Sequence, residues 1–129
     1  IEVHDIFKKY LNGKVALDHI TVQFYRHQIT AFLGHNGAGK TTLISILTGI
    51  VPPTSGDAWI DGSDIRYDMS AIRTRLGICP QHNVLWDELT VWEHMLFYGL
   101  LKGAQLRDVI IESKQMVRNL GIPHRRHAM

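Results

Sequence analysis

The chain has 129 residues, of which 45% are hydrophobic and 20% charged, and its formal net charge is +2. This composition is typical of a single globular domain, and so small a net charge gives no support to nucleic acid as a partner. No apolar stretch reaches the ~18 residues that a membrane-spanning helix needs. The single cysteine, Cys79, excludes an internal disulfide framework and fits a reducing environment.

The N-terminal part of the chain predicts a small β layer. Residues 3–7 and 20–24 alternate in polarity, as half-buried strands do, and a turn at Asn12-Gly13 separates them. Residues 29–33 are apolar and partly β-branched, which predicts a third, buried strand.

Residues 34–41 read Gly-His-Asn-Gly-Ala-Gly-Lys-Thr, a complete G-x-x-x-x-G-K-[ST] motif directly after that predicted strand. A helix is predicted from about residue 42 to residue 50, and its apolar side chains share one broad face: Leu43, Ile44, Ile46, Leu47 and Ile50. The strand–loop–helix context makes nucleotide binding the principal hypothesis for this segment. The alternative is a Gly-rich turn that only precedes a helix.

The residue types of the motif suit a chain of phosphates. Glycines let the backbone curl so that several N–H groups point at an anion, and a helix N-terminus adds its dipole and unpaired donors. Lys40 can reach the β- and γ-phosphates, the Thr41 hydroxyl can ligate Mg²⁺, and Thr42 is placed to donate near the α-phosphate. The predicted binding residues of this segment are Gly34, Asn36, Gly37, Ala38, Gly39, Lys40, Thr41 and Thr42.

The middle of the chain predicts short elements. A turn cluster over residues 52–56 precedes a strand at 58–60 and a second turn at 61–62. Ser70 is the predicted N-cap of a short helix that ends near residue 75. Residues 76–79 predict a core strand, in which the free cysteine is a small apolar side chain.

Two helices are predicted near the C-terminal end. Thr90 and Glu93 have the spacing of a capping box at the start of the first helix. The second is amphipathic, runs from about residue 106 to residue 120 and stops at Gly121, with Pro123 just beyond. The basic cluster at residues 124–127 is interpreted as a solvated or frayed tail.

The order of these motifs resembles the nucleotide-binding domain of ABC transporters. The resemblance covers nearly the whole chain and depends on the phosphate-binding motif followed by Pro53-Thr54-Ser55-Gly56, Asp61-Gly62, Pro80-Gln81 and Leu89-Thr90-Val91-x-Glu93. The stretches 28–40 and 77–85 are similar to the A subfamily, the large lipid exporters. His27-Gln28, where most such domains carry Gly-Glu, supports that subfamily.

The resemblance implies an α/β fold. We expect an incomplete P-loop NTPase core of ABC type with an N-terminal antiparallel β layer and the start of a helical subdomain. Residues 1–80 would form the β layer and P-loop core, residues 81–89 the Q-loop, and residues 90–129 part of the helical subdomain.

The resemblance also assigns roles beyond the loop. Tyr10 matches the aromatic position that stacks on adenine, although alone it would be an ordinary aromatic at a strand end. Gln81 matches the Q-loop glutamine, which ligates Mg²⁺ and orients the attacking water, although alone it would be a surface turn residue. Residues 83–89, with Leu85 and Trp86, resemble the face that contacts the transmembrane domains, and the alternative is a mobile loop with a buried tryptophan.

Taken together, the resemblance implies ATP and Mg²⁺ as cofactors, Lys40 and Gln81 as catalytic residues, and Thr41 and Gln81 as metal ligands. It implies ATP hydrolysis coupled to lipid transport, on the cytosolic face of a membrane. The implied partners are a second nucleotide-binding domain and the transmembrane domains of the same chain, which would handle the lipid substrate; nucleic acid is not expected.

The 129 residues contain no Leu-Ser-Gly-Gly signature, and the resemblance places the Walker B carboxylates and the switch histidine after it. We therefore expect a portion of a longer protein that binds Mg-ATP weakly and does not hydrolyse it alone.

Three alternatives remain open. A GTPase or small-molecule kinase is opposed by the absence of an Asn-Lys-x-Asp motif. A soluble ABC-type protein acting on ribosomes or DNA is opposed by the near-neutral charge. The third is a truncated product that only binds nucleotide or competes for a partner.

Overall fold

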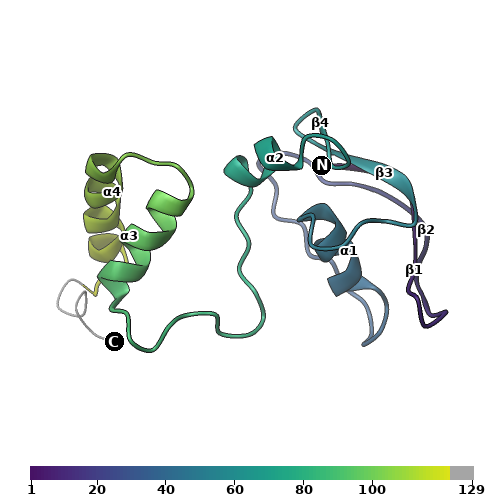
Figure 1. Ribbon diagram of the computed structural model, residues 1–129, viewed down its shortest axis with the longest axis horizontal. Helices are drawn as coiled ribbons and strands as arrows, with labels where there is room; N and C mark the ends of the chain where they lie inside the picture. Colours follow the sequence, from purple (N-terminus) through teal and green to yellow (C-terminus); the bar gives the residue numbers. More distant parts are fainter. Residues whose placement is uncertain (123–129) are drawn as a thin grey trace. The chain divides into compact units, whose positions relative to one another are not determined.

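The computed structural model describes residues 1–122, and the chain divides into two compact units, Ile1–Ile78 and Cys79–Met129 (Figure 1). The predictions for Pro123 and for the basic cluster at 124–127 lie outside the described residues. Within the described part of the chain, no helix has both the length and the apolar character that crossing a membrane requires.

The first unit is built on a four-stranded antiparallel sheet. Its strands are β1 (Glu2–Lys9), β2 (Val15–Gln23), β3 (Ser55–Ile60) and β4 (Ser63–Asp64), in the order β2-β1-β3-β4. The predicted hairpin is confirmed, and Gly13 takes a φ of 84° in its turn. The antiparallel β layer is therefore present, although its third strand is β3 and not the segment 29–33.

Two helices pack with this sheet, α1 (Lys40–Leu47) and α2 (Met69–Arg75). The core lies between the sheet and the helices, and its fully buried members include Val3, Ile6, Leu43, Ile46 and Ile72. The buried face of α1 is narrower than predicted because only positions three and four apart share a face. Ile44, which is off that face, and Ile50, which follows the helix, are exposed.

The predicted strands at 29–33 and 76–79 are both wrong. Each segment lacks a strand partner among the described residues, and Leu33 is 87% exposed and Ile78 53% exposed. The Cys79 thiol is also exposed and not a core side chain. An apolar, β-branched run becomes a strand only where a neighbouring strand pairs its N–H and C=O groups and covers its side chains.

The helix α2 begins one residue before the predicted cap, so Ser70 is not its N-cap. Asp68 takes that place: its carbonyl accepts from Ile72 N–H at 3.0 Å, and its carboxylate accepts from Asp64 N–H at 3.2 Å. The turn after β4 therefore fixes the start of the helix.

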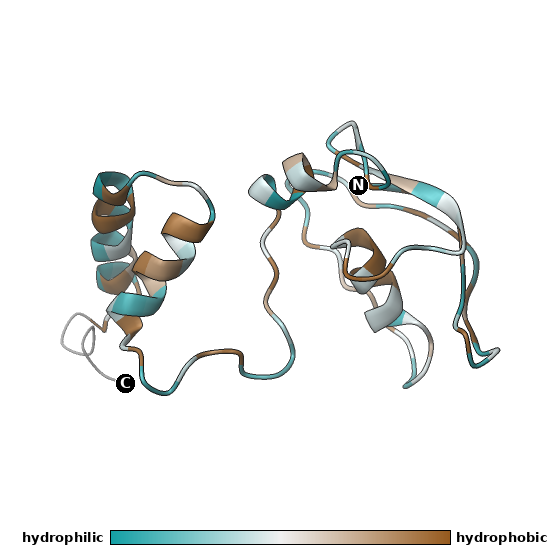
Figure 2. Ribbon diagram, in the orientation of Figure 1, coloured by the Kyte–Doolittle hydropathy of each residue, from teal (hydrophilic) through white to brown (hydrophobic). Residues whose placement is uncertain are grey.

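The second unit contains α3 (Val91–Leu101) and α4 (Leu106–Asn119). The capping box is confirmed: Thr90 Oγ1 accepts from Glu93 N–H at 3.2 Å, and the Glu93 carboxylate accepts from Thr90 N–H at 2.8 Å. The end of α4 is also as predicted, with Gly121 at a φ of 70°. The helix α4 carries both polar and apolar residues, as an amphipathic helix does, whereas α3 is mostly apolar (Figure 2).

Candidate functional site

The loop at residues 34–39 leads directly into α1, and two of its glycines have backbone angles that other residues rarely adopt. Gly37 and Gly39 both have a φ of 87°. A Cβ on Gly39 would lie 2.4 Å from the carbonyl oxygen of Ala16 and 2.6 Å from Leu17 Cδ2, so the loop is seated directly on β2. Gly34 has no positive φ, but a Cβ there would lie 3.1 Å from that of Ala38.

The start of α1 carries donors that the helix itself does not use. Its first intrahelical bond runs from Leu43 N–H to the Gly39 carbonyl at 2.9 Å. The N–H groups of Lys40, Thr41 and Thr42 precede that bond, as the first donors of any helix do. The first turn contains no acidic residue, so the positive end of the helix dipole is not offset there.

The Lys40 ammonium lies across the loop. Its Nζ donates to the carbonyl of Gly34 at 2.5 Å and to that of His35 at 2.8 Å. His35 Nδ1 is 2.9 Å from the carbonyl oxygen of Asn36, which can only accept, so this nitrogen carries the proton. The cation and the free helix donors thus belong to one short segment, as the motif predicts.

An aromatic side chain reaches this segment from the β layer. Tyr10 follows the end of β1, and its hydroxyl oxygen is 3.3 Å from Thr42 Oγ1 in the first turn of α1. Tyr10 is 37% exposed, and the Nζ of Lys8 lies 5.4 Å from the centroid of its ring. The structure therefore brings two predicted site residues together, and the stacking role of Tyr10 stays a prediction.

The remaining predicted site residue, Gln81, is in the second unit. Its side chain is exposed and its backbone lies in the irregular segment between α2 and α3. No group of three or more His, Cys, Asp or Glu side chains suited to a metal occurs in residues 1–122. A role for Gln81 in metal binding or catalysis stays a prediction.

Segment 83–89, which the sequence assigns to partner contact, is attached to α3 by an aromatic cluster. Trp86 lies 5.1 Å from Phe97 and 6.1 Å from Tyr98 between ring centroids, yet it is 46% exposed. The alternative, a mobile loop with a buried tryptophan, is therefore wrong about the burial of Trp86. The cluster also includes His94, which the sequence did not single out; a histidine inside the mostly apolar helix α3, four residues after its cap, was the available signal.

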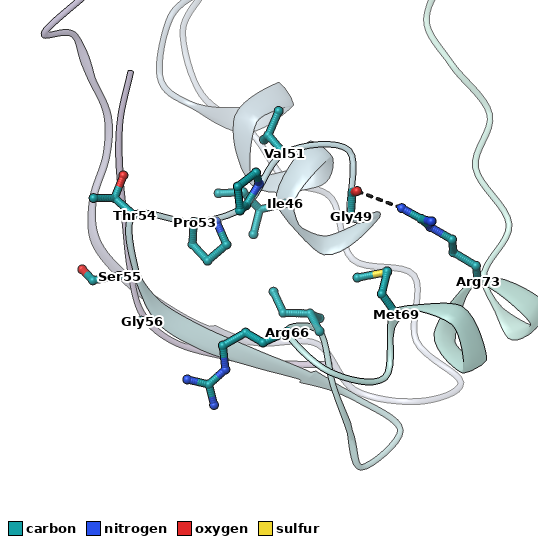
Figure 3. Close-up of a pocket in the computed structure, with 12 residues that line it drawn as sticks. Ile46, Gly49, Val51, Pro53, Thr54, Ser55, Gly56, Arg66, Met69 and Arg73 are labelled. Atoms are coloured by element: carbon teal, nitrogen blue, oxygen red, sulfur yellow. Dashed lines mark hydrogen bonds between the residues drawn. The ribbon is translucent and has the colours of Figure 1, made fainter. Parts of the chain in front are cut away.

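A separate cavity of about 640 Å³ lies in the first unit, between the C-terminal end of α1, the loop before β3 and the start of α2 (Figure 3). Arg73 donates from Nη2 to the Gly49 carbonyl at its edge, at 2.9 Å. Arg66 also lines it and donates to both carboxylate oxygens of Asp64, at 3.0 Å and 2.6 Å. These hydrogen bonds hold the pKa of Asp64 below its ordinary value, and Asp64 raises the pKa of Arg66. None of the predicted site residues lines this cavity.

Comparison with known proteins gives concordant matches. Residues 17–129 match the family model described as ABC transporter. The human retinal-specific phospholipid-transporting ATPase ABCA4 is 52% identical over 115 residues, 89% of this chain and 5% of its own length. The rat ATP-binding cassette sub-family A member 2 is 49% identical over 128 residues, 98% of this chain and 5% of its own length.

A solved structure described as an ATP-binding subunit of an ABC transporter superposes with a TM-score of 0.86 at 26% identity. It covers 99% of this chain, which spans 53% of that structure. The fold expected from the sequence, a partial P-loop NTPase of α/β class, is confirmed, and so is the resemblance to the A subfamily.

Proposed function

We propose, from the premise that this chain belongs to the ABC transporter family, that it binds ATP for an ATPase that moves lipid across a membrane. The chain is part of an ABC transporter ATP-binding domain. One observation carries the proposal: the Lys40 ammonium lies across the loop, the free N–H groups of α1 follow that loop directly, and the Tyr10 hydroxyl reaches Thr42 in the first turn of α1. These are a cation, a set of directed donors and a flat apolar surface.

Each of these groups fits one part of ATP. The triphosphate would take the place between the loop N–H groups and Lys40 Nζ, which now donates to two loop carbonyls. On binding, the ammonium would exchange these two loop carbonyls for phosphate oxygens. The exposed face of Tyr10 would stack on the base, a contact with little preference among bases.

Mg²⁺ would be held by oxygen ligands, which this cation prefers. The exposed Thr41 hydroxyl, in the first turn of α1, and the exposed Gln81 amide oxygen are suitable donors. When bound, the cation would neutralise charge on the β- and γ-phosphates. In our proposal Lys40 binds and orients the γ-phosphate, and Gln81 orients the attacking water.

The proposed setting is the cytosolic face of a membrane. A second nucleotide-binding domain and the transmembrane domains would be the partners, with the lipid handled by the latter. Support comes from relatives of the A subfamily, of which the human one is named as a phospholipid-transporting ATPase. Segment 83–89 supports a contact with the transmembrane domains because Leu85 and Trp86 present exposed apolar surface.

The test is Mg-ATP affinity of the full-length protein with Lys40→Ala, measured by titration calorimetry. Loss of the cation should weaken binding at least tenfold, since hydrogen bonds to charged groups contribute about 1.5–3 kcal/mol. Lys114→Ala is the matched control, because Lys114 is an exposed lysine on α4 outside the proposed site. Equal affinity of Lys40→Ala and the unmodified protein would reject the proposal.

A further inference from the structure

A buried histidine connects segment 83–89 to α3. His94 is 8% exposed, and it is one of only two polar residues that are buried in the described part of the chain, the other being Ser113. A buried polar side chain must find hydrogen-bond partners to offset its lost hydration. His94 has two, one for each ring nitrogen.

The partners determine which nitrogen carries the proton. His94 Nε2 lies 3.0 Å from the backbone nitrogen of Trp86, which can only donate, so Nε2 accepts. Its Nδ1 lies 3.0 Å from the carbonyl oxygen of Thr90, which can only accept, so Nδ1 donates. Both bonds exist together in one neutral tautomer, protonated at Nδ1.

The same imidazole supports the Trp86 side chain. The two rings stack at 6.0 Å between centroids with an interplanar angle of 18°, and Tyr98 stacks on His94 at 6.4 Å and 18°. Trp86 is therefore bound through both its backbone and its ring, while the rest of its surface remains exposed. Leu89 N–H donates to the Trp86 carbonyl at 3.1 Å, so a fixed Trp86 also constrains the turn from Trp86 to Leu89.

We infer that His94 is the positioning residue of segment 83–89, and that its protonation releases that segment from α3. This inference rests on the proposed function in one respect: the segment is taken to be the surface that contacts the transporter's membrane domains. Protonation places a hydrogen on Nε2, so two donors then face each other and the bond from Trp86 must break. Histidine is the side chain that ordinarily gains a proton below neutral pH, so acidification is the trigger.

In the described residues, no carboxylate pairs with His94 to stabilise its protonated form. His94 forms no ion pair within residues 1–122. The titratable side chains on the elements beside it are Asp87 and Glu88 of segment 83–89, Glu93, Tyr98 and Lys102 in and directly after α3, and Arg107, Asp108, Glu112, Lys114 and Arg118 of α4. Lys102 and Glu112 line the same groove as His94 and carry opposite charges, so neither sign prevails beside the ring.

The first test measures hydrogen exchange at the Trp86 backbone amide in the full-length protein. The result is expressed as a protection factor, the intrinsic exchange rate at each pH divided by the observed rate. Protection, followed from about pH 8 to pH 5, should fall roughly threefold to tenfold as the ring gains its proton, the factor expected for one hydrogen bond. His94→Gln keeps an acceptor at a similar reach without titrating, so protection should persist and lose this pH dependence. His94→Leu should remove protection at both pH values.

His82→Gln is the matched control, because His82 is an exposed histidine of the same unit, and it should reproduce the unmodified protein. If the pH dependence persists in His94→Gln, or if His94→Leu keeps full protection, the inference is overturned. Neither result affects Lys40→Ala, whose ATP affinity tests the proposed function separately.

The second test asks whether the released segment matters for coupling. The ratio of lipid-stimulated to basal ATPase activity should fall on acidification in the unmodified protein and stay constant in His94→Gln. A ratio that falls equally in both proteins would overturn the role of His94 in coupling.

Discussion

The close contact between the loop and β2 can be tested with two alanine substitutions, one at a glycine that touches β2 and one at a glycine that does not. Gly37 and Gly39 have the same φ of 87°, so an alanine at either position incurs the left-handed strain of about 1–2 kcal/mol. A Cβ on Gly37 meets nothing within 4 Å, whereas one on Gly39 would lie 2.4 Å from the Ala16 carbonyl oxygen. That atom belongs to the backbone of β2 and cannot rotate away, so we expect about 1–3 kcal/mol more for Gly39→Ala.

The assay is equilibrium urea unfolding followed by the fluorescence of Trp59, which lies on β3 of the same unit. Gly13→Ala is a control for strain outside the loop, since Gly13 has a φ of 84° and open space around its Cβ position. We expect Gly13→Ala and Gly37→Ala to lose similar amounts of unfolding free energy, and Gly39→Ala to lose clearly more. Equal losses for Gly37→Ala and Gly39→Ala would refute the argument that close contact with β2 fixes the loop.

Three other contacts lead to testable outcomes. Thr90→Ala removes the capping box and should lower stability by about 1 kcal/mol in urea unfolding followed by the fluorescence of Trp92, which lies on α3 itself, whereas Thr90→Ser should not. Tyr10→Ala should weaken ATP binding by about 1–3 kcal/mol and leave a base-less triphosphate unaffected; equal losses for both ligands would contradict base stacking. Arg66→Gln should flatten the acid side of a plot of Tm against pH. The pKa of Asp64 is lowered in the folded state, so its contribution is present above the ordinary aspartate range and is lost as pH falls through the lowered value, below roughly pH 4. An unchanged acid slope would contradict that linkage.

Most features that depend on neighbouring residues were predicted well from the sequence, the exception being the N-cap of α2, which is Asp68 and not Ser70. The turn at Asn12-Gly13, the capping box of Thr90 and Glu93 and the end of α4 at Gly121 are each decided within a few positions. In each case the backbone angle or hydrogen bond that the residue satisfies is local, so no distant partner can change the outcome.

Features that depend on distant partners were not predicted. Residues 29–33 and 76–79 have the composition of buried strands, but a strand requires another strand to pair with it, and the described residues supply none. The same reason places the Cys79 thiol in solvent. His94 was missed because its two hydrogen bonds involve a backbone N–H eight positions earlier and the carbonyl of the helix cap, which no motif encodes.

The candidate site combines features decided by neighbouring residues with contacts between residues far apart in the sequence. The loop and the start of α1 are local and could be recognised from the motif, whereas the contact between Tyr10 and Thr42 joins residues 32 positions apart. Leu33, directly before the loop, is exposed, so in the described residues that segment gives the loop little support. The β1–β2 hairpin supplies the support instead, through Ala16 and Leu17 beneath Gly39 and through Tyr10 at the end of β1. The β1–β2 hairpin, which lies outside the G-x-x-x-x-G-K-[ST] motif, therefore orients the loop that carries this motif.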